Sequence, residues 1–307
     1  MTFADIDFAL SFGGLIAGII VGLTGMGGAA LVTPMLVLIF GINPATAVSS
    51  DVVAAAIMKP VGSWVHIRNK TVHWGLVSWL SAGSIPGVLI GSFIFNAVLQ
   101  TSDASDTIKT WLGAVLLVAV AAMVAKTFLA ARAFRKYGAQ EQLGTKMPVK
   151  PIPTLILGAS VGLIVGMTSV GSGSLVVTVL LLLYPLLRPS VLVGTDLTQA
   201  VPMLIAGAIA HAGLGEIDIA VVVSLLIGQI PGVLVGSRLS TRYDGHLLRY
   251  LLMVVLAVTA LKLLGVVSSL FAGVVAITAT AVIGGFMIRE LAQKRAVQKM
   301  EQPTEVR

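Results

Sequence analysis

Long apolar runs separated by short polar breaks make up most of this chain. Each run is bounded by charged residues, Gly or Pro, which is typical of helices that end at a polar boundary. Several runs reach the roughly 20 residues that a helix needs to cross a bilayer, whereas the two that open each half of the chain are shorter. The predicted segments cover residues 10–23, 29–41, 46–66, 73–98, 108–131, 152–167, 173–187, 191–212, 217–239, 246–264 and 266–288.

The composition agrees with this pattern. Apolar residues make up 57% of the 307 positions and charged residues 11%, with a mean hydropathy of +1.00. Because soluble domains carry about 25% charged residues, we predict an all-α polytopic membrane protein. The absence of Cys excludes a disulfide-stabilised secreted scaffold. The net charge of +7 does not indicate nucleic-acid binding, because the basic clusters flank apolar runs and lack interleaved aromatic residues.

The sequence repeats itself after about half its length. A shift of 144 places Gly14, Gly18 and Gly22 on Gly158, Gly162 and Gly166. A shift of 145 matches a longer set, which pairs Pro44, Asp51, Met58, Gly62, His66, Pro86, Gly87, Gly91 and Ser92 with Pro189, Asp196, Met203, Gly207, His211, Pro231, Gly232, Gly236 and Ser237. Asp and His are scarce in this chain, so their agreement indicates a duplication rather than chance.

The charges of equivalent loops predict that the two halves lie in the membrane with opposite topology. The loop at 66–70 is basic, whereas its partner at 211–218 carries acids and no Lys or Arg. Under the positive-inside rule the first loop is cytoplasmic, the N-terminus is outside and the C-terminus is cytoplasmic. The expected divisions are a first transmembrane repeat at 1–131, a basic cytoplasmic linker at 132–151, a second repeat at 152–264, an extra span at 265–288 and a cytoplasmic tail at 289–307.

Each half opens with small residues at every fourth position and then a Gly-rich break. The breaks lie at 24–28 and 168–174. The spacing alone is explained by close packing of helices. The breaks carry more information, because backbone N–H groups released at membrane depth need a partner. If helices restart near Ala29 and Ser174, their N-terminal amides form anion sites, and the opening segments are re-entrant hairpins or short tilted spans.

The segment at 46–66 carries ionisable side chains on one face. At 100° per residue, Lys59 and His66 lie about 20° apart around the helix and Asp51 within about 80° of both. Ionisable residues inside spans are rare and usually functional. The second copy has Asp196 and His211 but no second Lys, because Leu204 stands where Lys59 would be.

Structural roles compete with functional ones at these positions. Asp51 and Asp196 lie near helix starts, where a carboxylate can cap a helix or pin a facing hairpin through backbone hydrogen bonds. His66 and His211 lie at loop edges, where an interfacial His is commonly structural. The Asp and His residues lack the i, i+4 spacing of a helical metal site, so we expect no metal and no cofactor.

The motifs resemble those of the sulfite exporter TauE/SafE family. The resemblance spans about residues 10–265. It is carried by GLIAGIIVGLTGMGGAALVTPML and PATAVSSDV in the first half, and by GASVGLIVGMTSVGSGSLVV, VGTDLTQAV, GAIAHAGLGEID and GQIPGVLVGSRLS in the second. The resemblance implies a membrane permease for a small anion, often sulfite, thiosulfate or a sulfonate.

We therefore expect a secondary transporter of the inner membrane that moves a small anion by alternating access at the repeat interface, with export favoured. Its partners are the substrate and the lipid bilayer. An enzyme is not expected, because HExxH and Cys nucleophiles are lacking. A metal or cation carrier and a non-transporting scaffold stay open as alternatives. The expected substrate-binding residues are Thr24, Gly25, Gly27, Gly28, Ser49, Ser50, Lys59, Thr168, Ser169, Gly171, Ser172, Gly173, Thr195 and Gln199, and the expected proton-coupling or gating residues are Asp51, Asp196, His66 and His211.

Overall fold

The computed structural model describes residues 6–24, 29–137, 147–214, 216–240 and 246–268, and within these ranges its regular elements are all helices, without strands. The first half contributes α1 (Phe8–Thr24), α2 (Ala29–Leu38), α3 (Pro44–Arg68), α4 (Trp74–Leu99) and α5 (Ala104–Tyr137). The second half contributes α6 (Pro151–Thr168), α7 (Ser174–Leu183), α8 (Pro189–Ala212), α9 (Ile219–Ser240) and α10 (His246–Leu263).

The helices match the predicted segments, with differences at a few ends. The helix expected at 108–131 runs from Ala104 to Tyr137 and takes in the first residues of the expected linker, because a helix can continue past an apolar run where no Gly or Pro ends it. The helix expected at 173–187 ends at Leu183, since the residue before Pro185 disfavours helical geometry. The extra span lies almost wholly, and the C-terminal tail entirely, outside the described residues.

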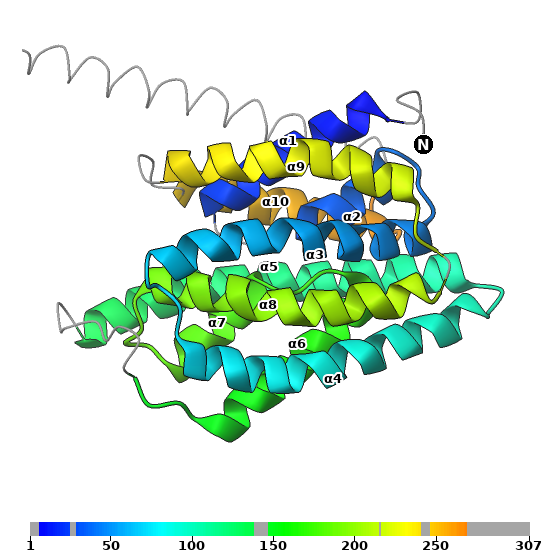
Figure 1. Ribbon diagram of the computed structural model, residues 1–307. Helices are drawn as coiled ribbons and strands as arrows, with labels where there is room; N and C mark the ends of the chain where they lie inside the picture. Colours follow the sequence, from blue (N-terminus) through cyan, green and yellow to red (C-terminus); the bar gives the residue numbers. More distant parts are fainter. Residues whose placement is uncertain (1–5, 25–28, 138–146, 215, 241–245, 269–307) are drawn as a thin grey trace, which may run out of the picture.

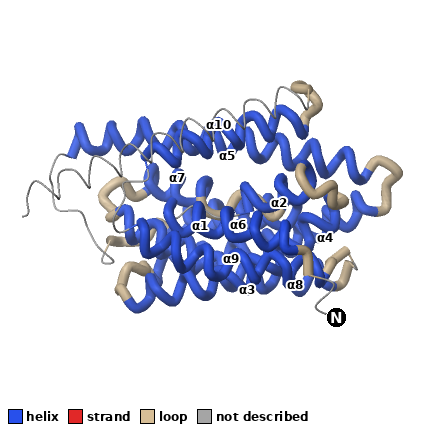
Figure 2. Tube along the Cα trace, turned by 90° about the horizontal axis from the view of Figure 1, so that it is seen from above, coloured by secondary structure: helices blue, strands red, loops and turns tan. Residues whose placement is uncertain are grey.

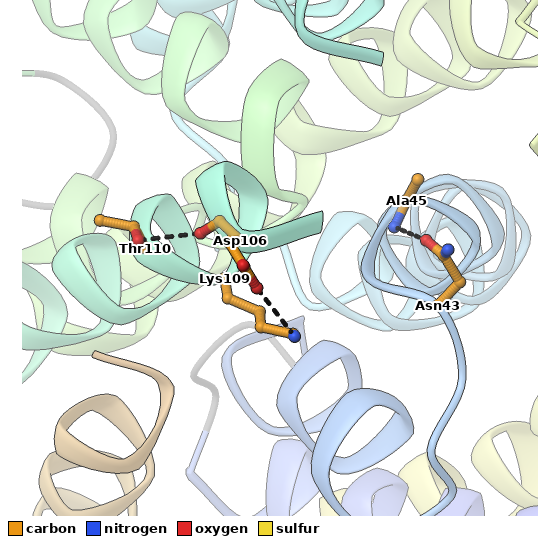
Figure 3. Close-up of polar contacts among 5 residues, drawn as sticks. All are labelled: Asn43, Ala45, Asp106, Lys109 and Thr110. Carbon is orange, nitrogen blue, oxygen red and sulfur yellow. Dashed lines mark hydrogen bonds and ion pairs between the residues drawn. The ribbon is translucent and has the colours of Figure 1, made fainter. Parts of the chain in front are cut away.

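Polar side chains support the starts of two helices at the surface. The Asn43 side chain precedes α3 and its Oδ1 accepts a hydrogen bond from Ala45 N at 2.9 Å, as Figure 3 shows. In the first turn of α5, Lys109 Nζ lies 3.2 Å from Asp106 Oδ1, and Thr110 Oγ1 donates to the Asp106 carbonyl (Figure 3). Such exposed contacts define helix starts and contribute little to stability.

The outer helices pack in two pairs, and each pair combines one helix of the first half with one helix of the second half. α1 lies along α9, and α6, the counterpart of α1, lies along α4, the counterpart of α9. These two pairs occupy the top and bottom of Figure 1, with α3 and α8 between them. α5 and α10 lie together along one edge, and the short helices α2 and α7 are placed between this pair and the central helices (Figure 2).

Small residues allow the outer pairs to touch backbone to backbone. A Cβ added to Gly228 on α9 would stand 1.8 Å from the carbonyl oxygen of Ser11 on α1. The equivalent Gly83 on α4 would place a Cβ 2.1 Å from the carbonyl oxygen of Leu155 on α6. The small residues at every fourth position therefore serve helix packing in both halves.

The central helices α3 and α8 run antiparallel. At one end, Asp218 N, just beyond α8, donates to Ser50 Oγ near the start of α3 at 3.0 Å. At the other end, His73 N, beyond α3, donates to Thr195 Oγ1 near the start of α8 at 3.1 Å. Because 50 and 195, and 73 and 218, are equivalent positions, one contact is repeated at both ends and the equivalent helices point in opposite directions.

Each half opens with a helical hairpin. In the second half, Tyr184 at the end of α7 accepts from Lys150 N at 2.8 Å and contacts Thr154 near the start of α6, so the chain enters and leaves at one end. In the first half, a Cβ on Gly13 near the start of α1 would meet Met35 Sδ near the end of α2 at 2.9 Å. The two hairpins therefore have the same form.

Several helices have the dimensions of membrane spans. Within the described residues, five stretches are long and apolar enough to cross a bilayer: Trp74–Leu99, Ala104–Leu129, Pro151–Thr168, Ser190–Ala212 and Ile219–Gly236. α3 is equally long but is not among them, and its polar side chains are buried between other helices. The chain is a multi-pass membrane protein with its polar helix at the centre.

Candidate functional site

The break between α6 and α7 has the irregular backbone that the sequence predicts. Thr168 ends α6, and its Oγ1 donates to the Ile164 carbonyl at 2.7 Å. Ser169 adopts left-handed geometry with φ 61°, and Gly171 and Gly173 have φ values of 126° and 104° that suit Gly. α7 begins at Ser174 without a side-chain cap. The break is therefore held by contacts from other helices.

Two side chains of α3 bind this break. Asp51 is 1% exposed, and its Oδ2 accepts from Ser169 Oγ at 2.9 Å and from Thr33 Oγ1 of α2 at 2.6 Å. Lys59 is 2% exposed, and its Nζ donates to Ser172 Oγ at 2.5 Å. α3 thus connects both hairpins through side chains that are charged in water.

Asp196 of α8 approaches the same break from the other side. It is fully buried, and its carboxyl group faces the backbone amide of Gly173 at the start of α7. Gln199 Nε2 lies 3.5 Å from Asp196 Oδ1, and Gln199 Oε1 accepts from Ser84 Oγ at 3.3 Å. Lys59 interacts electrostatically with both Asp51 and Asp196. The predicted anion position at the α7 N-terminus therefore faces a carboxylate, and the positive charge nearest the break is Lys59.

Two adjoining cavities lead to this cluster. The larger, with a volume of about 60 Å³, lies along α3 between His66 and Lys59 and is walled by α1, α8 and α9. The smaller, of about 10 Å³, continues from Lys59 to Asp51 and Gln229. Both are lined by Val21 of α1 and Met58 of α3 as well as Lys59. Lys59 therefore lies at the junction between the larger cavity, which extends from His66, and the smaller cavity, which extends to Gln229.

Some of the predicted binding residues bond other helices instead of lining these cavities. Ser49 Oγ lies 3.0 Å from His211 Nδ1, and His211 Nε2 lies 3.0 Å from the Gly166 carbonyl oxygen. A carbonyl only accepts, so Nε2 carries a proton and donates it, while Nδ1 and the Ser49 hydroxyl share the second hydrogen bond. Ser50 and Thr195 accept the loop amides that join the ends of α3 and α8.

His66 has different surroundings from its equivalent His211. Its Nδ1 lies 2.9 Å from Thr71 Oγ1 in the following loop, and its side chain is half-buried along the larger cavity. The two His residues are therefore found at opposite ends of the central helix pair, one lining an opening and the other inside packed helices.

The first break lies mostly outside the described residues. Gly25, Gly27 and Gly28 are not described, and the side chain of Thr24 is not described either. Its flanks are placed, because Gly22 lines the larger cavity and Val32 the smaller one. Residues on either side of the first break thus border the cavities that reach Lys59.

One protein family matches most of the chain, including the parts that build this site. The family model described as sulfite exporter TauE/SafE matches residues 10–263, which include both hairpins and both central helices. The chain belongs to the TauE/SafE family. This TauE/SafE protein is a membrane transporter by family, and no solved structure matches it.

Curated relatives carry the same general description. A probable membrane transporter protein, YjnA of Bacillus subtilis (strain 168), is 38% identical over 82% of this chain and 97% of its own length. YdhB of the same organism, also named a probable membrane transporter protein, is 26% identical over 80% of this chain and 96% of its own. A probable membrane transporter protein of Xylella fastidiosa (strain 9a5c) is 27% identical over 81% and 90%.

The structure adds residues that the sequence reasoning missed. Gln229 lines the smaller cavity and Thr33 bonds Asp51, although neither was among the expected site residues. A polar side chain inside an apolar run was the available signal for both. Within the described ranges, no group of three or more His, Cys, Asp or Glu residues is arranged to hold a metal ion.

Proposed function

We propose that this TauE/SafE transporter exports a small anion, such as sulfite, thiosulfate or a small organosulfonate, across the cytoplasmic membrane. The observation that carries the proposal is the position of Lys59. It is a buried ammonium group at the meeting point of two cavities, and it bonds a hydroxyl of a broken helix. An ammonium group has three donors, so Lys59 can hold Ser172 and still donate to an anion.

Residues of the second break complete the proposed site. Ser172 supplies a hydroxyl beside the ammonium group, and Ser169, Gly171 and Gly173 shape the backbone around it. Ionised Asp51 and Asp196 together would outweigh Lys59, so an entering anion would meet net negative charge. A proton on either carboxylate removes this penalty, and we assign the two carboxyl groups to proton coupling for that reason.

The same charge pattern gives the proposed orientation and direction. The His66 end of α3 precedes the basic loop at 66–70, and the positive-inside rule places this loop in the cytoplasm. The larger cavity then opens to the cytoplasm, with the N-terminus outside and the two halves inverted relative to each other. An inside-negative potential of 100 mV favours outward movement of one negative charge by about 2.3 kcal/mol, so export needs no coupling partner.

A cation carrier is the second candidate, because two buried carboxylates, Asp51 and Asp196, lie close to the cavities. Purified protein in detergent separates the two. We expect sulfite or thiosulfate to raise the melting temperature and Na⁺, K⁺ or divalent cations to leave it unchanged. Stabilisation by a cation alone would favour the cation carrier, and no stabilisation by any ion would favour a scaffold.

Flux in liposomes completes the test. An anion that stabilises the protein is loaded inside vesicles, and its release is followed with and without an imposed potential. We expect release to need the protein and to accelerate when the potential repels the anion from its compartment. Release that is equal in protein-free vesicles would refute transport.

A further inference from the structure

Gln229 of α9 is a buried polar side chain whose carbonyl oxygen has no partner. It is 2% exposed, lines the smaller cavity together with Asp51 and Lys59, and its Oε1 has no hydrogen bond within the described part of the chain. An unpaired buried carbonyl is costly, and such groups are rare in native structures. Its place on a cavity wall indicates that a ligand supplies the missing hydrogen bond.

At the equivalent place in the other half the hydroxyl and the amide are paired, although Asp196 Oδ2 beside them has no hydrogen bond within the described part of the chain. Ser84 of α4 occupies the position of Gln229, and its hydroxyl donates to Gln199, whose amide in turn approaches Asp196. That side has Leu204 in place of Lys59. Lys59 of α3 and Gln229 of α9 therefore line one cavity, whereas the equivalent positions carry Leu204 on α8 and Ser84 on α4.

The chemistry of these groups defines the ligand. An anion accepts hydrogen bonds from Lys59, but a fully deprotonated oxyanion has nothing to donate to the Gln229 oxygen. Resting on the proposed function, we propose that Gln229 makes the site selective for singly charged oxyanions that keep one O–H group. The anion accepts from Lys59 and donates its O–H to Gln229 Oε1.

The charge of the site favours the same species. Lys59 already interacts with Asp51 and Asp196, and Lys126 also interacts with Asp196. A dianion would bring a second negative charge into a buried site beside two carboxylates. A singly charged anion meets less repulsion and also satisfies the amide, so hydrogen sulfite suits the site better than sulfite dianion.

A pair of probes of equal shape and charge tests the O–H group directly. Methylphosphonate, at a pH where it carries one negative charge and one O–H, is compared with methanesulfonate, which carries one negative charge and no O–H. Each competes against sulfite flux in liposomes. We expect wild-type protein to bind methylphosphonate about tenfold more tightly than methanesulfonate, because methanesulfonate leaves the Gln229 carbonyl oxygen without a hydrogen bond.

Two variants assign the preference to Gln229. Gln229→Met keeps the length of the side chain and removes the acceptor, so the preference for methylphosphonate over methanesulfonate should fall to near unity. Ser224→Ala, at a buried hydroxyl on the same helix that accepts from Asp7 N, should keep the wild-type preference.

The outcomes separate this inference from the proposed function. Equal competition by the two probes in wild-type protein, or competition by neither at concentrations where sulfite saturates, overturns the selectivity and leaves anion transport standing. A wild-type preference retained in Gln229→Met overturns the role of Gln229. The wild-type comparison needs no variant, so poor folding of Gln229→Met does not remove the test. Absence of sulfite flux in wild-type protein is instead a failure of the proposed function.

Discussion

The two ends of the α3–α8 pair are built from equivalent residues but are arranged differently. At one end His211 lies within hydrogen-bond distance of the Gly166 carbonyl, and helices fill the space. At the other end the equivalents His66 and Gly22 both line the larger cavity. The His211 end is therefore closed by a contact that is not made between the equivalent residues at the His66 end.

The residue that faces each His from the neighbouring central helix also differs between the two ends. Ser49 bonds His211, whereas its equivalent Gly194 has no side chain, and a Cβ there would stand 3.0 Å from His66 Nδ1. The packing glycines, by contrast, are repeated faithfully. A duplicated fold can thus keep its symmetric framework while a few substitutions decide which end is closed and which half carries the charge.

The largest effect should come from removing that charge. Lys59→Met removes the cation that interacts with both Asp51 and Asp196 and deprives the anion of its ligand, so sulfite flux per folded protein should fall by about 1,000-fold. Lys59→Arg should retain part of the flux. Liposome efflux is the measurement, with Lys109→Met, in an exposed pair, as the control.

The asymmetry itself can be reversed with two substitutions. Lys59→Leu combined with Leu204→Lys moves the ammonium group from α3 to the equivalent position on α8. The residue equivalent to Gln229 is then Ser84 of α4. We expect flux to stay near the Lys59→Met level. Wild-type flux in this double variant would mean that the two halves are chemically equivalent.

Substitutions at equivalent packing glycines should have equal effects on stability in the two halves. Gly228→Ala and its equivalent Gly83→Ala each force a methyl group against a backbone carbonyl, and each should cost about 3 kcal/mol of stability. Gly213→Ala, whose Cβ would meet its nearest atom at 3.4 Å, should change stability by less than about 0.5 kcal/mol. Thermal unfolding in detergent compares them, and a large cost in one half alone would contradict symmetric packing.

Labelling can measure the difference between the open and closed ends. The sequence has no Cys, so one introduced thiol reports without background. Gly62 lines the larger cavity, where its Cβ would have room, while the equivalent Gly207 would place a Cβ 3.0 Å from Val88 Cγ2. We expect Gly62→Cys to react at least about tenfold faster with a membrane-impermeant maleimide, because local opening must precede reaction at 207.

The side of reaction checks the orientation in the same experiment. Inside-out vesicles should label Gly62→Cys and intact spheroplasts should not. Equal rates at 62 and 207 would contradict the closed end, and labelling of 62 from outside would reverse the proposed topology.

The smallest effects should come from neutralising the carboxylates. Asp51→Asn keeps an oxygen that can accept from Thr33 and Ser169, so melting temperature should change little while the pH dependence of flux shifts. Asp196→Asn should act similarly. A few-fold change in the ratio of rates at two pH values is expected, and unchanged pH profiles in both variants would leave the carboxylates with a structural role only.

Much of the framework could be predicted from the chain. The apolar runs predicted ten of the helices to within a few residues at most ends, because a run bounded by charge, Gly or Pro has few other ways to satisfy its backbone in lipid. The break before Ser174 followed from its Gly and hydroxyl residues. The roles of Ser49, Ser50 and Thr195 as bonds between helix ends did not follow, because a hydroxyl in a span has the same sequence signature whether it binds a helix or a ligand.

Sequence alone determined the membrane class, the duplication, the family and the scarcity of charge that singles out Lys59, since all of these depend on residue type and spacing. Tertiary structure decided that Asp51, Lys59 and Asp196 meet at one break, that Gln229 faces a cavity, and that the His66 end is open while the His211 end is closed. These features depend on contacts between helices that are far apart in the sequence. Equivalent residues of a repeat have the same type at both ends, so residue type alone does not predict which end is open.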